Sequence, residues 1–269
     1  MYGAILGDIA GSRFEFSKPK GFNPWKVDLF SNSCFFTDDT VMSIATKYAV
    51  LSNIPYARAY RMFGRRYPKA GYGTMFKQWL DGYSERGYNS FGNGAAMRVC
   101  YIGEHFDTME QVKEEARKSA CCTHNHPEGV KGAQATALSV YLCRNGCSKK
   151  ELKRYIEKNF GYNLRKRLAW MRPFSRFDIT CQGTLPLALI CFFESDSWEE
   201  CIRNVFSIRC DTDTVGCIAG GIAEAYYHTT GMNNEKILRH FLVKPKPEGG
   251  MDTFLLDWAC AQRGDIPEK

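Results

Sequence analysis

Two segments far apart in the chain share one pattern, in which paired acidic residues precede apolar residues at helical spacing. The first is Thr-Asp-Asp-Thr at positions 37–40, followed by apolar residues at intervals of three and four up to Leu51. The second is Asp-Thr-Asp-Thr at positions 211–214, followed by the same spacing up to Tyr227. This period predicts two amphipathic helices, each with carboxylates at its N-terminus.

The first residues of the chain predict a third helix that also carries acidic residues. Gly3, Gly7 and Gly11 are four residues apart, so they form a stripe that would let this helix approach a neighbour closely. Asp8 and Glu15 would lie two turns apart on a common face of the helix. They are candidates for a further acidic contribution to a site at the other two helix starts.

The rest of the chain also favours helices. Pro127 stands in the first turn of one predicted helix, and Ser197 with Glu200 forms a capping-box pattern before another. Strand signals are sparse, so the predicted fold class is all-α. No Ser/Gly tract or low-complexity segment divides the 269 residues, and this length suits one large core. We therefore predict a single compact multi-helix domain over residues 1–269.

Composition limits the cellular locations and the classes of binding partner that we expect. The first residues lack the features of a signal peptide, and the longest apolar stretch, Leu185–Phe193, is too short to cross a bilayer. We therefore expect a soluble, cytoplasmic monomer with no membrane partner, whose twelve cysteines are reduced thiols. The net charge of +7 is spread along the chain without an aromatic-interleaved basic stripe, which disfavours a nucleic-acid binding module.

The paired acidic residues are more numerous than helix capping requires, since one aspartate is enough to interact with a helix dipole. If the two helix starts converge, each close pair of carboxylates would repel by about 4 kcal/mol at an effective dielectric constant near 20. Bound cations would remove this cost. Oxygen ligands from Asp and Thr suit Mg²⁺ or Mn²⁺ better than zinc or copper. We therefore predict a binuclear metal site and a hydrolytic reaction, for which a sugar, a phosphate ester or a diphosphate would all fit.

Five motifs in series resemble those of the ADP-ribosylglycohydrolase family. They are Gly3, Gly7, Asp8, Gly11 and Glu15; Thr37-Asp38-Asp39-Thr40; Gly92-Asn93-Gly94-Ala95-Ala96-Met97-Arg98; Thr123-His124-x-His126-Pro127-Glu128; and Asp211-x-Asp213-Thr214. They run in order over nearly the whole chain, and the series is far more specific than any one motif. The resemblance implies an all-α domain with a dimetal cleft that removes ADP-ribose from a modified target.

The resemblance also implies roles for single residues. Two Mg²⁺ ions, with Mn²⁺ as an alternative, would be bound by Thr37, Asp38, Asp39, Asp211, Asp213 and Thr214. Glu15 matches the family's flexible acid, and the catalytic residues that assist attack of water on the anomeric carbon of ribose would be Glu15, Asp39 and Asp213. Substrate-binding residues would be Gly92, Asn93, Gly94, Met97 and His124. An ordinary turn at residues 92–94 and a structural role for His124 are the plain alternatives, and His126 would hold the loop.

The predicted function is Mg²⁺-dependent cleavage of the glycosidic bond between ADP-ribose and an acceptor. The acceptor stays open between a protein side chain such as arginine or serine, a small molecule and a nucleic-acid adduct, because the leaving group lies outside the motifs. Two alternatives are a non-catalytic ADP-ribose-binding protein of the same fold and a metal-dependent phosphatase. One departure from the family pattern is Arg209-Cys210 in place of Gly-Gly, which would narrow the pocket, pair with a ligand phosphate or point outward.

Overall fold

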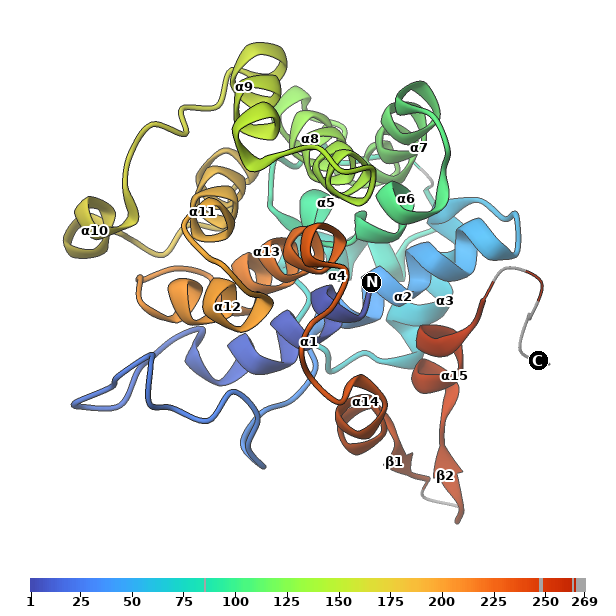
Figure 1. Ribbon diagram of the computed structural model, residues 1–269. Coiled ribbons are helices and arrows are strands. Elements are labelled where there is room, and N and C mark those ends of the chain that lie inside the picture. The colour runs from blue at the N-terminus through green and yellow to red at the C-terminus, as the bar shows by residue number, and fades with distance from the viewer. Residues whose placement is uncertain (85, 247–248, 263, 265–269) are drawn as a thin grey trace.

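The computed structural model describes residues 1–84, 86–246, 249–262 and 264, most of which form helices (Figure 1). The helices are α1 (Tyr2–Gly11), α2 (Asp38–Leu51), α3 (Tyr56–Arg66), α4 (Thr74–Asp81), α5 (Gly94–Met97), α6 (Cys100–His105), α7 (Met109–Cys121), α8 (Pro127–Arg144), α9 (Lys149–Phe160), α10 (Leu168–Met171), α11 (Cys181–Phe193), α12 (Trp198–Phe206), α13 (Thr212–Tyr227), α14 (Asn234–Leu242) and α15 (Phe254–Cys260). Two short 3₁₀ helices, Ser12–Phe14 and Arg172–Phe174, follow α1 and α10.

Among the described residues, the only two strands form a small hairpin, and an isolated antiparallel bridge joins Gly92 to Thr180. The hairpin pairs β1 (Lys244–Pro245) with β2 (Met251–Asp252) in antiparallel fashion. The predicted all-α fold class is therefore confirmed. Across the described part of the chain, no helix has both the length and the apolar character that a transmembrane span requires.

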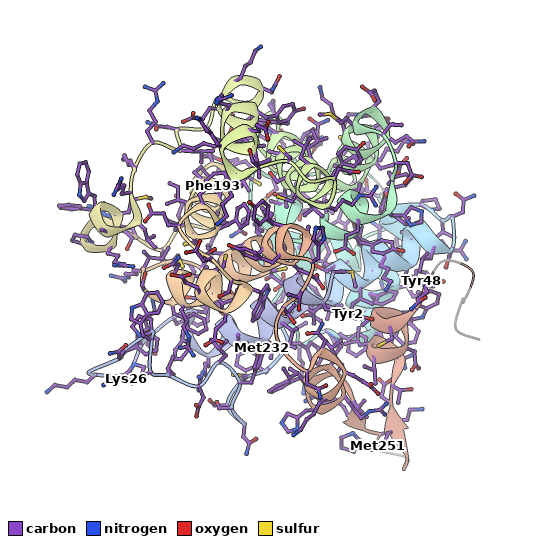
Figure 2. All side chains as sticks on the ribbon, in the orientation of Figure 1. Tyr2, Lys26, Tyr48, Phe193, Met232 and Met251 are labelled. Atoms are coloured by element: carbon purple, nitrogen blue, oxygen red, sulfur yellow. The ribbon has the colours of Figure 1, made fainter. Side chains whose placement is uncertain are left out.

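Helix α13 lies at the centre of the fold. Its residues from Thr212 to Ala223 are all buried, because α1, α2, α5, α6, α8, α11 and α12 all contact it. In the view of Figure 1, α8 and α11 lie above α13, and α1 and α12 lie below it. Side chains fill the spaces between these helices (Figure 2), and the buried ones form one continuous hydrophobic core.

Helices α1 and α13 pack with almost no space between their backbones. A Cβ atom on Gly7 would lie 2.1 Å from the carbonyl oxygen of Gly216, and one on Gly11 would lie 2.4 Å from that of Thr212. Both distances are far shorter than van der Waals contact, so only glycine fits at these positions. The predicted close approach of the first helix to a neighbour is confirmed, and it carries Asp8 to the start of α13.

Side-chain caps fix where the helices begin. Thr37 caps α2 by accepting a hydrogen bond from the Asp39 N–H, so the helix starts where the sequence predicts. At α12, Ser197 accepts a hydrogen bond from the Glu200 N–H, as predicted. The Glu200 carboxylate, however, accepts from the N–H of Asp196 rather than of Ser197, so only half of the expected capping box forms.

The first helix is shorter than the sequence suggested. Helix α1 ends at Gly11, and a 3₁₀ turn separates it from Glu15. Asp8 and Glu15 therefore do not share a helix face, and the expected spacing of two helical turns was wrong. Both nevertheless lie beside Asp213, because the 3₁₀ turn contacts α13 as α1 does.

Candidate metal centre

Three carboxylates from three helices meet at the N-terminal end of α13. Asp8 of α1, Asp39 of α2 and Asp213 of α13 each place an oxygen within 4.8 Å of the other two. All three side chains are buried, with exposed fractions of 0%, 1% and 4%. The two acidic helix starts therefore meet in space, and α1 adds a third carboxylate to them.

Asp8 is held in place by hydrogen bonds from the start of α2. The N–H groups of Thr37 and Thr40 donate to its Oδ2 at 3.0 Å and 3.1 Å. The Thr37 hydroxyl donates to Oδ1 at 2.8 Å, and the Thr40 hydroxyl also donates to Oδ2. Asp8 thus satisfies N–H groups that have no partner inside α2. This contact docks α1 onto α2 and fixes the orientation of the Asp8 carboxylate.

Asp39 has one oxygen with partners and one without. Its Oδ2 accepts a hydrogen bond from the Thr214 hydroxyl at 3.1 Å, and the Thr37 hydroxyl lies 3.2 Å from the same oxygen. Its Oδ1 is buried and has no hydrogen-bond partner among the described residues. A buried carboxylate oxygen without a partner is costly, and a cation next to Oδ1 would remove that cost.

A second group of three carboxylates shares Asp213 with the first. Glu15, Asp211 and Asp213 each place one oxygen within 4.8 Å of the others. Asp211 Oδ2 accepts a hydrogen bond from Asn93 Nδ2 at 2.7 Å, which ties the loop before α5 to the start of α13. Two overlapping groups of carboxylates offer places for two cations that share Asp213 as a ligand.

Burial and mutual repulsion raise the pKa of the carboxyl groups in these two groups and next to them. Burial is the largest cause at each of them, and neighbouring carboxylates add to it at Glu15 and Asp38. The pKa is raised to about 6 for Asp8, about 7 for Glu15 and about 8 for Asp38. For Asp39 and Asp213 the pKa is raised well above the usual range. Without a counter-charge these groups would hold protons near neutral pH, and a divalent cation would displace them.

The chemistry of these side chains fits a hard divalent cation. Among the described residues, both groups that could hold an ion consist of carboxylates alone, without His or Cys. Mg²⁺ and Mn²⁺ prefer oxygen ligands, whereas zinc and copper favour nitrogen and sulfur. The unpartnered Oδ1 of Asp39 and the raised pKa values point to the same class of ion.

Two of the predicted metal ligands, Asp38 and Thr37, lie next to the two groups of three carboxylates. Asp38 lines the cavity in front of the carboxylates but belongs to neither group of three. Thr37 is buried and does not line that cavity, and its hydroxyl is engaged by Asp8 and Asp39. Thr214 does line the cavity. The structure thus brings Asp39, Asp211 and Asp213 together, places Thr37 as a support behind them, and adds Asp8.

A cavity of about 520 Å³ opens in front of the carboxylates. This volume is within the range of sites that enclose a small-molecule ligand. All five predicted substrate-binding residues line it, namely Gly92, Asn93, Gly94, Met97 and His124. Several apolar and aromatic lining residues were not identified from the motifs: Phe16, Met42, Phe76, Tyr88, Phe177 and Ile179.

The position of His124 explains a glycine in the neighbouring loop. A Cβ atom on Gly94 would lie 3.1 Å from His124 Nε2, so the ring packs directly against the loop backbone. His124 Nδ1 lies 2.7 Å from the Thr123 hydroxyl. Burial, and to a smaller extent the nearby Arg98, lowers the pKa of His124 well below its usual range. The ring is therefore neutral at the wall of the cavity.

His126 has a different role from His124. Its Nδ1 accepts a hydrogen bond from the Glu128 N–H at 3.1 Å and so caps α8, with Pro127 in the first turn. It does not line the cavity. The prediction that His126 holds the loop agrees with this contact.

Arg209 lies outside the cavity that faces the carboxylates. Its side chain is exposed and lines a neighbouring cavity of about 700 Å³, while its N–H donates to the Ser175 hydroxyl at 2.9 Å. The two cavities share Glu15, Phe16 and Phe177 in their walls. Of the three positions considered for Arg209, the outward one is therefore observed.

Comparisons with known proteins point to one family. The sequence profile of the ADP-ribosylglycohydrolase family matches residues 1–239. The chain is 26% identical to ADP-ribosylhydrolase ARH3 of Mus musculus, over 84% of this chain and 82% of that protein. It is also 26% identical to ADP-ribosylhydrolase ARH3 of Homo sapiens, over 84% of each protein. Identity to ADP-ribosylarginine hydrolase Tri1 of Pseudomonas putida is 24%, over 87% of this chain and 71% of that protein.

The fold has a counterpart among solved structures. A structure described as an ADP-ribosylglycohydrolase-related protein complex matches it with a TM-score of 0.71 and 22% sequence identity, over 88% of this chain and 90% of that chain. The family profile covers most of the sequence and the helical architecture agrees with this structure. The chain therefore belongs to the ADP-ribosylglycohydrolase family.

Proposed function

We propose that this protein is a magnesium-dependent hydrolase that releases ADP-ribose from a modified acceptor. The observation that carries the proposal is the meeting of Asp8, Asp39 and Asp213 beside a cavity large enough for a nucleotide. Membership of the family supports the same activity. So do the names of the relatives, which are ADP-ribosylhydrolases.

Arg98 and the loop of residues 92–94 suit the diphosphate of ADP-ribose. Arg98 is buried and lines the cavity. One of its guanidinium nitrogens donates to the Ser119 carbonyl and the Thr123 hydroxyl, both at 2.7 Å, so its charge is fixed in position. Gly92 and Gly94 let a ligand approach the loop backbone closely. This arrangement would bind an anion without a mobile lysine or arginine.

The carboxylates would position the proximal ribose and the attacking water. Two bound Mg²⁺ ions would polarise ribose hydroxyls and water and would offset the charge of the carboxylates. Glu15 is half-buried, and burial with neighbouring carboxylates raises its pKa to about 7, which suits a group that exchanges protons near neutral pH. We assign it as the general base. Asp39 and Asp213 would hold the site and stabilise positive charge on the ribose.

Further properties of the chain are proposed along with this activity. Residues 1–269 would form one domain, which the single continuous core supports. The protein would act as a cytoplasmic monomer on an ADP-ribosylated protein or small conjugate, with Mn²⁺ able to replace Mg²⁺. The phosphatase alternative loses its basis, because that class places its nucleophile after a buried strand and α13 is preceded by helix α12.

A direct assay tests the proposal. Peptides carrying ADP-ribose on arginine or on serine are incubated with the protein and Mg²⁺, and released ADP-ribose is measured by mass spectrometry. We expect release from at least one peptide, loss of release with a chelator, and recovery on adding Mg²⁺. No release from either peptide or from an ADP-ribosylated oligonucleotide, or release that a chelator does not reduce, would contradict the proposal. Calorimetric binding of ADP-ribose without turnover would favour the non-catalytic alternative.

A further inference from the structure

Residues 165–177, which we call the basic segment, form a short stretch with a high density of positive charge. They include five basic residues and no acidic one: Arg165, Lys166, Arg167, Arg172 and Arg176. The whole chain has 36 basic and 29 acidic residues. Without this segment 31 basic residues would face 29 acidic ones, and the chain would be nearly neutral. The segment thus carries five positive charges and no negative one within thirteen residues, although basic residues are spread along the rest of the chain as expected.

The basic segment also exposes large aromatic rings between its basic residues, so the expected absence of an aromatic-interleaved basic stripe was wrong. The exposed fractions are 76% for Trp170 and 81% for Phe174. Leu168 is buried and anchors the segment, and its N–H donates to Glu194 Oε1 at 2.9 Å. Figure 1 shows α10 at the edge of the molecule, beyond α11 and α12. Rings of this size are normally buried, so two of them exposed in one short segment mark a binding surface.

Part of the segment forms the wall of a surface groove of about 420 Å³. Four basic side chains line this groove: Lys153, Arg165, Lys166 and Arg167. Two acidic residues lie close by. They are Glu194, which also lines the groove, and Glu157, whose carboxylate is 4.0 Å from the Arg165 guanidinium. Positive charge remains in excess, so the groove attracts anions with several charges.

The basic segment leads directly into the cavity of the metal centre. Its last residue, Phe177, lines that cavity, and the ring centre of Phe177 lies 6.1 Å from that of Phe16. The chain then runs beside the loop of residues 92–94, where the Ile179 carbonyl accepts a hydrogen bond from the Asn93 N–H at 2.8 Å. A ligand bound along the segment would therefore reach the opening of the cavity at Phe177.

A second row of basic groups continues beside the segment. The cavity that adjoins the metal centre is lined by Lys18 and Arg209 as well as by Phe177. Arg172 Nε donates to the Ser207 hydroxyl at 2.9 Å, so the segment is tied to the wall of this cavity. Basic groups therefore lie both at the groove and in the wall of the cavity that adjoins the metal centre.

We propose that the basic segment binds single-stranded nucleic acid. A nucleotide of this strand that carries ADP-ribose would then be a substrate that enters the cavity of the metal centre. The inference rests on the proposed hydrolase function. An acidic peptide would match the charges but would leave the faces of Trp170 and Phe174 without partners, whereas unpaired bases stack on such rings while phosphates contact Lys and Arg. A duplex keeps its bases stacked on each other and offers no free faces.

The reaction on this acceptor is an ordinary hydrolysis. The bond between the anomeric carbon of ribose and the acceptor atom of the nucleotide breaks, and a bond from that carbon to a water oxygen forms. One proton of the water passes to the released nucleotide. No oxidant, reductant or further reactant is needed.

Fluorescence anisotropy with a labelled, unmodified single-stranded DNA of about 12 nucleotides tests the binding surface. The variant R165Q/K166Q/R167Q removes three charges of the groove. The control R58Q/K113Q/K236Q removes three exposed charges on α3, α7 and α14. We expect the groove variant to raise Kd at least about tenfold at low salt and to lower the slope of log Kd against log salt by about 2. The control should stay within about twofold of the wild type.

The aromatic rings need a separate variant. W170A/F174A should weaken binding by roughly tenfold without changing the salt slope, because stacking does not release counterions. Circular dichroism melting shows whether each variant is folded. The inference is overturned if the two triple variants behave alike, if duplex DNA binds as tightly as the single strand, or if a poly-glutamate peptide binds more tightly than DNA.

Hydrolysis assays separate this inference from the proposed function. An oligonucleotide with one ADP-ribosylated end and an ADP-ribosyl-serine peptide are supplied to each protein. We expect the ratio of ADP-ribose release from the oligonucleotide to that from the peptide to fall at least about fivefold in the groove variant and to stay constant in the control. Release from the peptide alone, with no DNA binding, overturns the inference and leaves the proposed function intact. DNA binding that depends on the segment, with no hydrolysis of any conjugate, overturns the proposed function and with it the role of nucleic acid as an acceptor.

Discussion

The acidic wall of the cleft and the basic segment at its opening are built in opposite ways. The acidic wall consists of carboxylates on or beside α1, α2 and α13, and most of them are buried and held by hydrogen bonds between these helices. The basic segment is exposed and is attached through Leu168, Arg172 and Ser175. A change in the wall disturbs several helices at once, whereas a change in the segment alters mostly the surface. The reaction therefore depends on helix packing, and the choice of acceptor depends on a surface that can vary independently.

The largest expected effect comes from removing one charge of the acidic wall. Asp39→Asn keeps the shape of the side chain but loses the charge beside the unpartnered Oδ1. We expect hydrolysis to fall by about three orders of magnitude or more, since cation contacts contribute several kcal/mol to the barrier. The cation-free variant should be at least as stable as the wild type, because repulsion among buried carboxylates is reduced.

The surface residue Asp28 provides the matched control. Asp28→Asn makes the same chemical change at an exposed position and should keep activity within about twofold. Initial rates of ADP-ribose release and urea unfolding measure the two effects. An Asp39→Asn enzyme within tenfold of the wild type would show that the wall is not the reactive part of the cleft.

A smaller loss is expected at the junction of the two regions. Glu15 lines both cavities, and Glu15→Gln removes the proposed general base. We expect kcat to fall by about two orders of magnitude with KM changed little. Glu110→Gln, on the exposed face of α7, is the control. Equal losses in kcat and in affinity for ADP-ribose would assign Glu15 to binding instead of proton transfer.

Substitutions in the two regions should also differ in their effect on the free energy of unfolding. In Gly7→Ala the new Cβ would lie 2.1 Å from the Gly216 carbonyl oxygen, so α1 must move away from α13. We expect the free energy of unfolding to fall by about 2–3 kcal/mol. Gly73→Ala, whose Cβ would meet nothing within 4 Å, and Trp170→Ala in the exposed segment should each change it by less than about 0.5 kcal/mol. Urea denaturation with comparable losses in all three variants would remove the contrast.

The smallest effect is a pH dependence of the cation-free protein. Burial raises the pKa of Asp8 to about 6 and that of Asp38 to about 8, so the folded state holds protons that the unfolded state has released. A raised carboxyl pKa stabilises the fold at low pH, and this contribution is lost as the pH rises through the folded-state pKa. We expect unfolding in chelator to become easier by about 1 kcal/mol between pH 7 and 8, and Mg²⁺ to remove this trend. Stability that rises with pH in chelator would contradict the account.

Much of the acidic wall could be predicted from the sequence, because its signals are local. The start of α2 follows from Thr37, the two aspartates after it, and apolar residues spaced three and four apart. None of these signals requires knowledge of the rest of the chain. The role of Asp8 could not be predicted in the same way. It depends on how closely Gly7 lets α1 approach α13, and on Thr40 donating across to another helix.

The exposed rings of the basic segment could not be predicted from the sequence, for a different reason. Trp170 and Leu168 are both residues that usually pack in a core, and only the folded structure shows that Leu168 is buried and Trp170 is 76% exposed. The position of Phe177 in the cavity could not be predicted either. It depends on the pairing of residues 179–180 with the loop before α5. Long-range contacts set exposure here, and a motif carries no information about them.

The central claim is that carboxylates from α1, α2 and α13 bind two divalent cations. Crystals soaked in Mn²⁺ and measured at a wavelength where manganese scatters anomalously would locate the ions directly. The account predicts one anomalous peak among Asp8, Asp39 and Asp213 and a second among Glu15, Asp211 and Asp213. A fully soaked crystal with no peak at these carboxylates, or with peaks only elsewhere on the surface, would contradict it.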